Sequence, residues 1–284
     1  MTDRSATAKA PHPGTIIAIL AICGIVVSLM QGLVLPLISS LPELLHTSAS
    51  TAAWVVTATL LTAAIFTPIS GRLGDMFGKR RMLLIILGLL AAGSLLCAAS
   101  SSVVLVIIGR ALQGVSGGAL PLAIAILRDE LPAKRLGSAV AVVSATMGVG
   151  AAIGVAASAL IVQATNWHVL FWISTALGVI SLALVARLVP KSSERTRARF
   201  DWSGALGLSA GLVALLLAIS KGADWGWGSV PTLGLLVGSV LVLLGWGLME
   251  LRTAAPLVDL RVSARPRVLF TNLASLLIGA AMLV

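Results

Sequence analysis

One arginine stands inside a long apolar part of the sequence, and it carries the strongest chemical signal in the chain. Arg110 separates two uncharged runs, 82–109 and 111–127, and Gln113 follows it by three residues, so on a helix the two side chains share one face. An ionisable side chain within an apolar helix is costly and usually faces a polar interior or a water-filled path. The pair is therefore a candidate functional site that faces a polar interior or a water-filled path. The alternative is an arginine that extends outward from an ordinary helix start.

A second group of charged residues lies in a glycine-rich stretch, residues 71–81, which reads GRLGDMFGKRR. Its glycines predict a tight reversal between two helices, because larger side chains would clash there. Asp75 can cap a helix start or pair with a nearby arginine, and the basic residues that follow favour an anionic membrane face. The plainer interpretation is a positively charged turn. The candidate functional residues of this turn are Gly71, Gly74, Asp75, Gly78, Lys79 and Arg80.

Pairs of glycines four residues apart predict places where two helices approach closely. Gly114 and Gly118 form one such pair, just after Gln113, and Gly150 and Gly154 form another. Small residues at this spacing let a neighbouring backbone come near. We therefore expect these four glycines to pack against other helices.

Two further residues are candidates for the wall of a cavity. Gln31 lies within the first apolar run, where it can hydrogen-bond either a substrate or simply a neighbouring helix. Trp54 opens the second apolar run.

The remaining reactive side chains form no catalytic or metal-binding pattern. The two cysteines, Cys23 and Cys97, lie in separate apolar runs, and we interpret both as small packing residues. The three histidines are far apart in the sequence, and no nucleophile has a neighbouring base. We expect no metal, no cofactor and no enzymatic activity.

The composition shows what kind of chain must position these residues. It is 58% hydrophobic and 11% charged, with a mean hydropathy of +1.06, whereas a soluble domain is roughly 25% charged. Disorder is excluded by the same values, and 4% aromatic residues without a tyrosine argue against an outer-membrane barrel. The net charge of +10 is scattered between apolar runs, so nucleic-acid binding is not expected. The chain is predicted to be an all-α polytopic membrane protein.

Uncharged runs of about 20 residues mark the membrane crossings. The run 136–186 would form a helix of about 76 Å, far longer than a hydrocarbon core of about 30 Å, and the polar patch 163–168 divides it. Nine spans are therefore predicted, at 15–40, 50–70, 82–100, 103–127, 137–162, 168–189, 203–220, 231–250 and 268 onward.

The positions of Lys and Arg predict the orientation of these spans. With the N-terminus in the cytoplasm, eighteen of the twenty basic residues fall on the cytoplasmic side, and the exceptions are Arg110 and Lys221. The ninth span reaches Val284 without a polar residue after it. We therefore expect the chain to be the N-terminal part of a longer protein.

Several of these segments together resemble the major facilitator superfamily. Residues 71–81 are similar to its signature loop, residues 109–119 to its second motif, and residues 148–158 to the glycine-rich motif of its antiporters. The segments 54–61, 199–204 and 256–260 resemble the fourteen-span drug:proton antiporter branch. The sequence departs from these patterns at Met76, where a basic residue is usual, and at Ala151, where proline is usual.

The resemblance implies a function and a set of partners. It makes the candidate residues of the turn at 71–81 a cytoplasmic gating loop, with Asp75 as the acid of a latch on the inner gate. It links Arg110, together with Gln113, to proton coupling and transport. It implies a proton-coupled exporter of drugs or other small lipophilic molecules in the cell membrane, working by alternating access together with a second bundle that this chain lacks. A non-transporting membrane interaction or regulatory subunit is the alternative, ahead of a membrane-embedded enzyme.

The resemblance also implies a division of the chain. We expect a cytoplasmic tail over 1–14, and the first six-span bundle over 15–190. Cytoplasmic loops over 191–202 and 252–267 would flank two additional spans at 203–251. Residues 268–284 would begin the second bundle.

Overall fold

The computed structural model describes residues 12–191, 200–253 and 256–281, and every regular element in these ranges is a helix. The described residues fall into two compact units, one within residues 1–197 and one within 198–284. Eight helical segments in them are long and apolar enough to cross a membrane, as eight of the nine predicted spans require. The ninth prediction falls on α12 (Pro266–Ala281).

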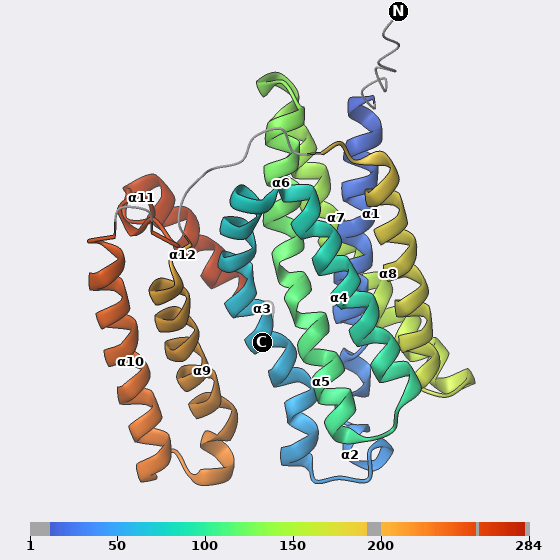
Figure 1. Cartoon of the computed structure of the whole chain (residues 1–284). Helices are drawn as coiled ribbons and strands as arrows, with labels where there is room; N and C mark the ends of the chain where they lie inside the picture. Colours follow the sequence, from blue (N-terminus) through green and yellow to red (C-terminus); the bar gives the residue numbers. More distant parts are fainter. Residues whose placement is uncertain (1–11, 192–199, 254–255, 282–284) are drawn as a thin grey trace, which may run out of the picture. The chain divides into compact units, whose positions relative to one another are not determined.

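The first unit contains six of these segments (Figure 1). Two of them include a short 3₁₀ turn, η1 or η2. The elements are α1 (Pro13–Gly32), η1 (Leu35–Leu37), α2 (Leu41–Leu44), α3 (Ala49–Phe77), α4 (Lys79–Ala99), α5 (Val103–Gly114), η2 (Val115–Gly118), α6 (Ala119–Glu130), α7 (Ala133–Ala164) and α8 (His168–Leu188).

The second unit is built on a hairpin of two long helices that lie side by side, α9 (Trp202–Trp225) and α10 (Val230–Glu250). Local sequence sets the starts of both helices. Asp201 accepts a hydrogen bond from the amide of Gly204, and Ser229 caps α10 in the same way. The short helix α11 (Leu260–Ser263) and α12 follow.

Several helix boundaries differ from the predictions; α1, for example, ends at Gly32 although the first span was expected to reach residue 40. The second span was expected to end near residue 70, but α3 continues to Phe77, and α4 begins at Lys79 rather than at residue 82. The fourth span was expected to be one helix, but η2 interrupts it at a glycine-rich turn. Charged residues and glycines end an apolar run without ending the helix. This explains why α3 continues past residue 70 and why α4 begins before residue 82.

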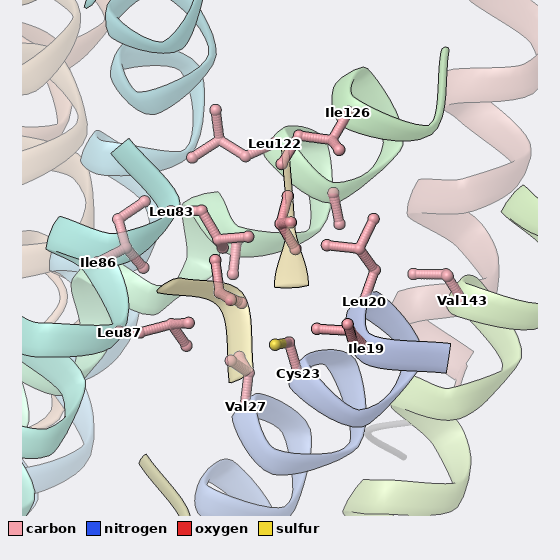
Figure 2. Close-up of a cluster of buried hydrophobic side chains, with 14 of the residues drawn as sticks. Ile19, Leu20, Cys23, Val27, Leu83, Ile86, Leu87, Leu122, Ile126 and Val143 are labelled. Carbon is pink, nitrogen blue, oxygen red and sulfur yellow. The ribbon is translucent and has the colours of Figure 1, made fainter. Parts of the chain in front are cut away.

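The core of the first unit lies where α1, α4, α6 and α7 meet. Figure 2 shows Leu20 of α1, Leu83 of α4, Leu122 of α6 and Val143 of α7 pointing toward a common centre, and all four side chains are fully buried. Large apolar side chains also cover the outside, as lipid requires; Leu160 is 70% exposed. The helices of the first unit therefore carry apolar side chains both toward the core and toward the outside.

Glycines on α7 allow helices α1 and α7 to pack closely against each other. A Cβ added to Gly154 would overlap the carbonyl oxygen of Leu29 and lie 3.2 Å from the Cα of Gly32, and Gly150 meets Ser28 and Ile25 in the same way. Close approach of backbones is a general means of packing helices in lipid. The predicted packing pair on α7 therefore lies in the α1–α7 contact.

This contact gives a first testable prediction. Gly154→Ala is expected to destabilise the fold by about 1–3 kcal/mol, because the added methyl group overpacks the contact. Gly148→Ala is the matched control, since Gly148 lies on the same helix and an added Cβ meets nothing within 4 Å. The midpoint of thermal unfolding in detergent should fall for the first variant only. Equal midpoints for the two variants would contradict the assigned contact.

Candidate functional site

The side chain of Arg110 is buried inside the first unit and bonded on two sides. It lies on α5 and is 4% exposed. Its Nε donates to the carbonyl oxygen of Val55 on α3, at 3.2 Å, and its Nη1 donates to Oε1 of Gln113, at 2.7 Å. The arginine therefore does not extend outward from the helix start, which was the alternative interpretation.

Gln113 extends this network to a third helix. Its Nε2 donates to Oγ of Ser94 on α4, at 2.7 Å, and Ser94 in turn donates to the carbonyl oxygen of Leu90, at 2.8 Å. Gln113 is 3% exposed and Ser94 is fully buried. Such a chain of buried polar groups is stable only while each member keeps its partner. We call Arg110, Gln113 and Ser94 the Arg110 network.

Thr59 adds a further link between α3 and α5. Its hydroxyl lies 3.1 Å from the carbonyl oxygen of Arg110 and 3.2 Å from that of Val55. One turn further along, Gly114 lies against Thr59 and Thr62, and Gly118 lies against Ser70. The predicted packing pair after Gln113 therefore brings η2 and the end of α5 onto α3.

A cavity of about 210 Å³ borders the Arg110 network. Arg110 and Thr59 form its polar lining together with Gln31 of α1, and the remaining walls are mostly apolar. Gln31, predicted as a cavity residue, thus lines the same cavity as Arg110. Trp54 lies on α3 but is not one of the described lining residues. The lining residues are Gln31, Gly32, Val34, Leu35, Ile38, Val56, Thr59, Leu60, Ala63, Arg110 and Ala151.

The predicted gating residues adopt a different local structure from the expected loop. Gly71 and Gly74 lie within α3, and the reversal takes place at a single residue, Gly78. Gly78 has φ = 101°, a conformation that side chains disfavour. Gly74 instead faces Leu122 of α6. The reversal is short because α3 ends at Phe77 and α4 begins at Lys79.

Lys79 carries the main ionic contact at this reversal. Its Nζ lies 2.7 Å from Oδ1 of Asp129, at the end of α6, and 3.9 Å from Oδ1 of Asp75. Asp75 was expected to cap a helix or pair with an arginine, but the residue that precedes α4 is Gly78 and the ion pair found for Asp75 is with Lys79. Asp129, which the sequence analysis did not single out, is the closer partner.

Arg80 contacts the last turn of another helix. Its Nε donates to the carbonyl oxygen of Val185, at 3.4 Å, and its Nη2 donates to that of Ala186, both on α8. A cation at these carbonyl groups also interacts favourably with the helix dipole. The end of α3, the start of α4 and the ends of α6 and α8 are thus connected by charged side chains.

Sequence reasoning missed several partners in the site. Ser94 is one of many serines in apolar runs, and the carbonyl group of Val55 has no side-chain signature. Asp129 stands beside Arg128 and reads as an ordinary charged helix end. The only available signal was the unusual burial that an arginine inside a span implies, which predicts acceptors without identifying them.

The long apolar helices and the buried polar network place this chain in the class of multi-pass α-helical membrane proteins. The chain belongs to the Major Facilitator Superfamily, whose family model matches residues 20–284.

Similar proteins include several named for drug resistance. The chain is 33% identical over 220 residues to the tetracenomycin C resistance and export protein of Streptomyces glaucescens, covering 76% of this chain and 40% of that protein. It is 27% identical over 209 residues to multidrug resistance protein 3 of Bacillus subtilis, covering 73% and 41%. The chain thus spans about two fifths of the length of these relatives.

Solved structures share the fold at low sequence identity. The inward-open xylose transporter of E. coli matches with a TM-score of 0.56 and 16% identity, covering 77% of this chain and 58% of that one. A peptide transporter matches with a TM-score of 0.61 and 15% identity, covering 85% and 52%.

Proposed function

We propose that this chain forms the first bundle and the additional helix pair of a proton-coupled exporter of small lipophilic molecules. The observation that carries the proposal is the mostly apolar cavity bordered by the Arg110 network. An apolar wall with a few placed polar groups is the usual form of a small-molecule site. The relatives named for tetracenomycin C and multidrug resistance support export as the direction.

The size of the cavity supports a binding site shared between two bundles. Pockets for drug-sized ligands measure about 300–1,000 Å³, and this cavity has about 210 Å³. A substrate would therefore occupy it only in part and contact a second bundle with its remaining surface. Transporters of this kind place the substrate near the bilayer midplane between two repeats and move one repeat against the other.

We propose that Arg110 takes part in proton coupling. Buried acids are absent from the middle of the described spans of the first unit, where Arg110 is the buried ionised group. A fixed guanidinium beside a cavity can orient water and favour negative charge on a neighbouring group. Asp75 and Lys79, with Asp129, would act as a latch between the helix ends, and Arg80 would tie α8 to them.

The proposed orientation places the N-terminus and the reversal at Gly78 in the cytoplasm of the cell. The reason is the positive-inside rule, because the predicted cytoplasmic ends carry eighteen of the twenty basic residues. An Arg81→Cys variant should react with a membrane-impermeant thiol reagent only after the cells are opened. Labelling of Arg81→Cys from outside intact cells would refute this orientation.

Efflux from cells tests the proposed function. Cells that produce the protein in its natural length should accumulate less of a lipophilic dye such as ethidium than cells without it. A protonophore that collapses the proton gradient should restore dye accumulation. Equal accumulation in both cell lines, for ethidium and for a panel of neutral and cationic dyes, would contradict export. Efflux that persists with the protonophore would contradict only the proton coupling.

A further inference from the structure

Two buried carboxyl groups meet at one end of the α9–α10 hairpin, in the second unit. Asp201 directly precedes α9 and is 8% exposed, and Glu250 is the last residue of α10 and is 2% exposed. A Cβ added to Gly204 would overlap Oδ2 of Asp201 and lie 2.8 Å from Oε2 of Glu250, so both oxygens border the same glycine. Within the described residues, neither Oδ2 of Asp201 nor Oε2 of Glu250 has a hydrogen-bond partner.

The other oxygen of each carboxyl group is bound to the backbone. Oδ1 of Asp201 accepts from the amide of Gly204 and the hydroxyl of Ser203, both at 2.8 Å. Oε1 of Glu250 accepts from the amide of Val258, at 2.7 Å. Each carboxyl group is therefore held in place from one side, and its second oxygen stays at the shared position beside Gly204.

The charged groups that the structure describes around this pair have other partners or form no ion pair with it. Among the described residues, neither acid forms an ion pair. Arg261 of α11 donates from its guanidinium to the carbonyl oxygen of Leu251, at 2.8 Å, and Asp259 accepts from the amides at the start of its own helix. Lys221 and Asp224 pair with each other near the opposite end of α9. Among the residues that the structure describes, the other charged groups near α10, α11 and the start of α12 are Arg252, Arg265 and Arg267.

We propose that Asp201 and Glu250 form a proton-binding site that holds one shared proton. Two adjacent buried carboxylates repel each other, and a proton between Oδ2 and Oε2 removes that repulsion and gives both oxygens a partner. Glu250 is the donor and Asp201 the carboxylate acceptor. Burial raises the pKa of Asp201, but hydrogen bonding from the backbone of Gly204, the side chains of Ser203 and Glu250 and the backbone of Leu257 outweighs this and lowers the pKa overall.

The shared proton has a structural consequence for the segment after α10. Because Glu250 also binds the amide of Val258, the protonated pair fastens this segment to the start of α9. Loss of the proton at high pH puts two negative charges side by side in a buried position. We therefore expect the segment around Val258, which leads into α11 and α12, to loosen as the pH rises.

Infrared spectroscopy of the whole chain in detergent tests for the proton. The carbonyl stretch of a protonated carboxylic acid should be present at neutral pH, where an ordinary glutamate is ionised. It should be lost in Glu250→Gln and retained in Glu43→Gln, because Glu43 is exposed on α2. The absence of this band from the wild type, or its persistence in Glu250→Gln, would overturn the proposal.

Hydrogen exchange tests the structural consequence. In the wild type, the amide of Val258 should exchange about tenfold faster at a pH at which the pair is deprotonated than at neutral pH. Both rates are corrected for the intrinsic pH dependence of exchange. In Glu250→Gln the amide of Val258 should show no such pH step, because the glutamine amide can donate to Asp201 at every pH. An equal pH step in both proteins would contradict the proposal. Calcium that removes the infrared band and protects Val258 would identify the site as a cation site instead, which would also overturn it.

Discussion

Replacement of Arg110 by lysine is expected to lower the rate of dye efflux at least about tenfold, which corresponds to about 1.4 kcal/mol. Lysine keeps the positive charge but lacks the planar fork that reaches the Val55 carbonyl oxygen and Gln113 together. If Arg110 acted through its charge alone, the lysine variant would keep the wild-type rate of efflux. The geometry of the Arg110 network instead requires two donors in fixed directions, and a flexible ammonium group would leave one acceptor unpaired.

The control for this variant lies in the same span. Arg128→Lys changes an exposed arginine in the last turn of α6, and it should leave efflux unchanged. Both variants must first be shown to reach the membrane in equal amounts. Wild-type efflux by Arg110→Lys would contradict the role assigned to the guanidinium.

Replacement of Gln113 by leucine is expected to give the largest loss of stability, about 3 kcal/mol. Gln113 accepts from Arg110 and donates to Ser94 at once. Leucine would leave a buried guanidinium nitrogen without this acceptor, and an unpaired buried charge costs more than an ordinary lost hydrogen bond. The midpoint of thermal unfolding in detergent should therefore fall clearly.

Gln163 provides the matched control, because it is an exposed glutamine near the end of α7. Gln163→Leu should unfold within the error of the wild type. Gln113→Glu should recover part of the lost stability, since its carboxylate still accepts from Arg110 although it no longer donates to Ser94. If Gln113→Leu and Gln163→Leu shift the unfolding midpoint equally, Gln113 does not hold Arg110 in place.

The hydropathy of the sequence predicts the helices well because lipid imposes a simple requirement. Any uncharged run of sufficient length must satisfy its own backbone hydrogen bonds, and only a helix does so within one segment. The common face of Arg110 and Gln113 is predictable for a related reason, since their spacing of three residues depends only on helix geometry. Both inferences need no knowledge of neighbouring helices.

The helix ends and the partners of the charged residues are not predictable in this way. An uncharged run shows where lipid begins, whereas α3 continues past Arg72 and Asp75 into water-compatible sequence until Gly78. Lys79 and Asp129 are 50 residues apart in the chain, and Arg80 and Val185 are 105 apart. These contacts exist only after the helices have packed, so no local pattern contains them.

Glu250 illustrates the same limit in the second unit. In the sequence it is one acid at the end of an apolar run, which is the ordinary place for a charge. Its burial and its closeness to Asp201 arise because α9 and α10 form a hairpin that brings the start of one helix to the end of the other.

Thiol labelling of the cavity tests most directly the claim that a small molecule binds beside Arg110. Gln31→Cys places a reactive group in the cavity wall, and Ser101→Cys places one in the exposed loop between α4 and α5. Both native cysteines are buried and should react slowly. A transported dye is expected to slow labelling of Gln31→Cys several-fold and to leave Ser101→Cys unchanged. Labelling of Gln31→Cys at the same rate with and without saturating dye would contradict the proposed site.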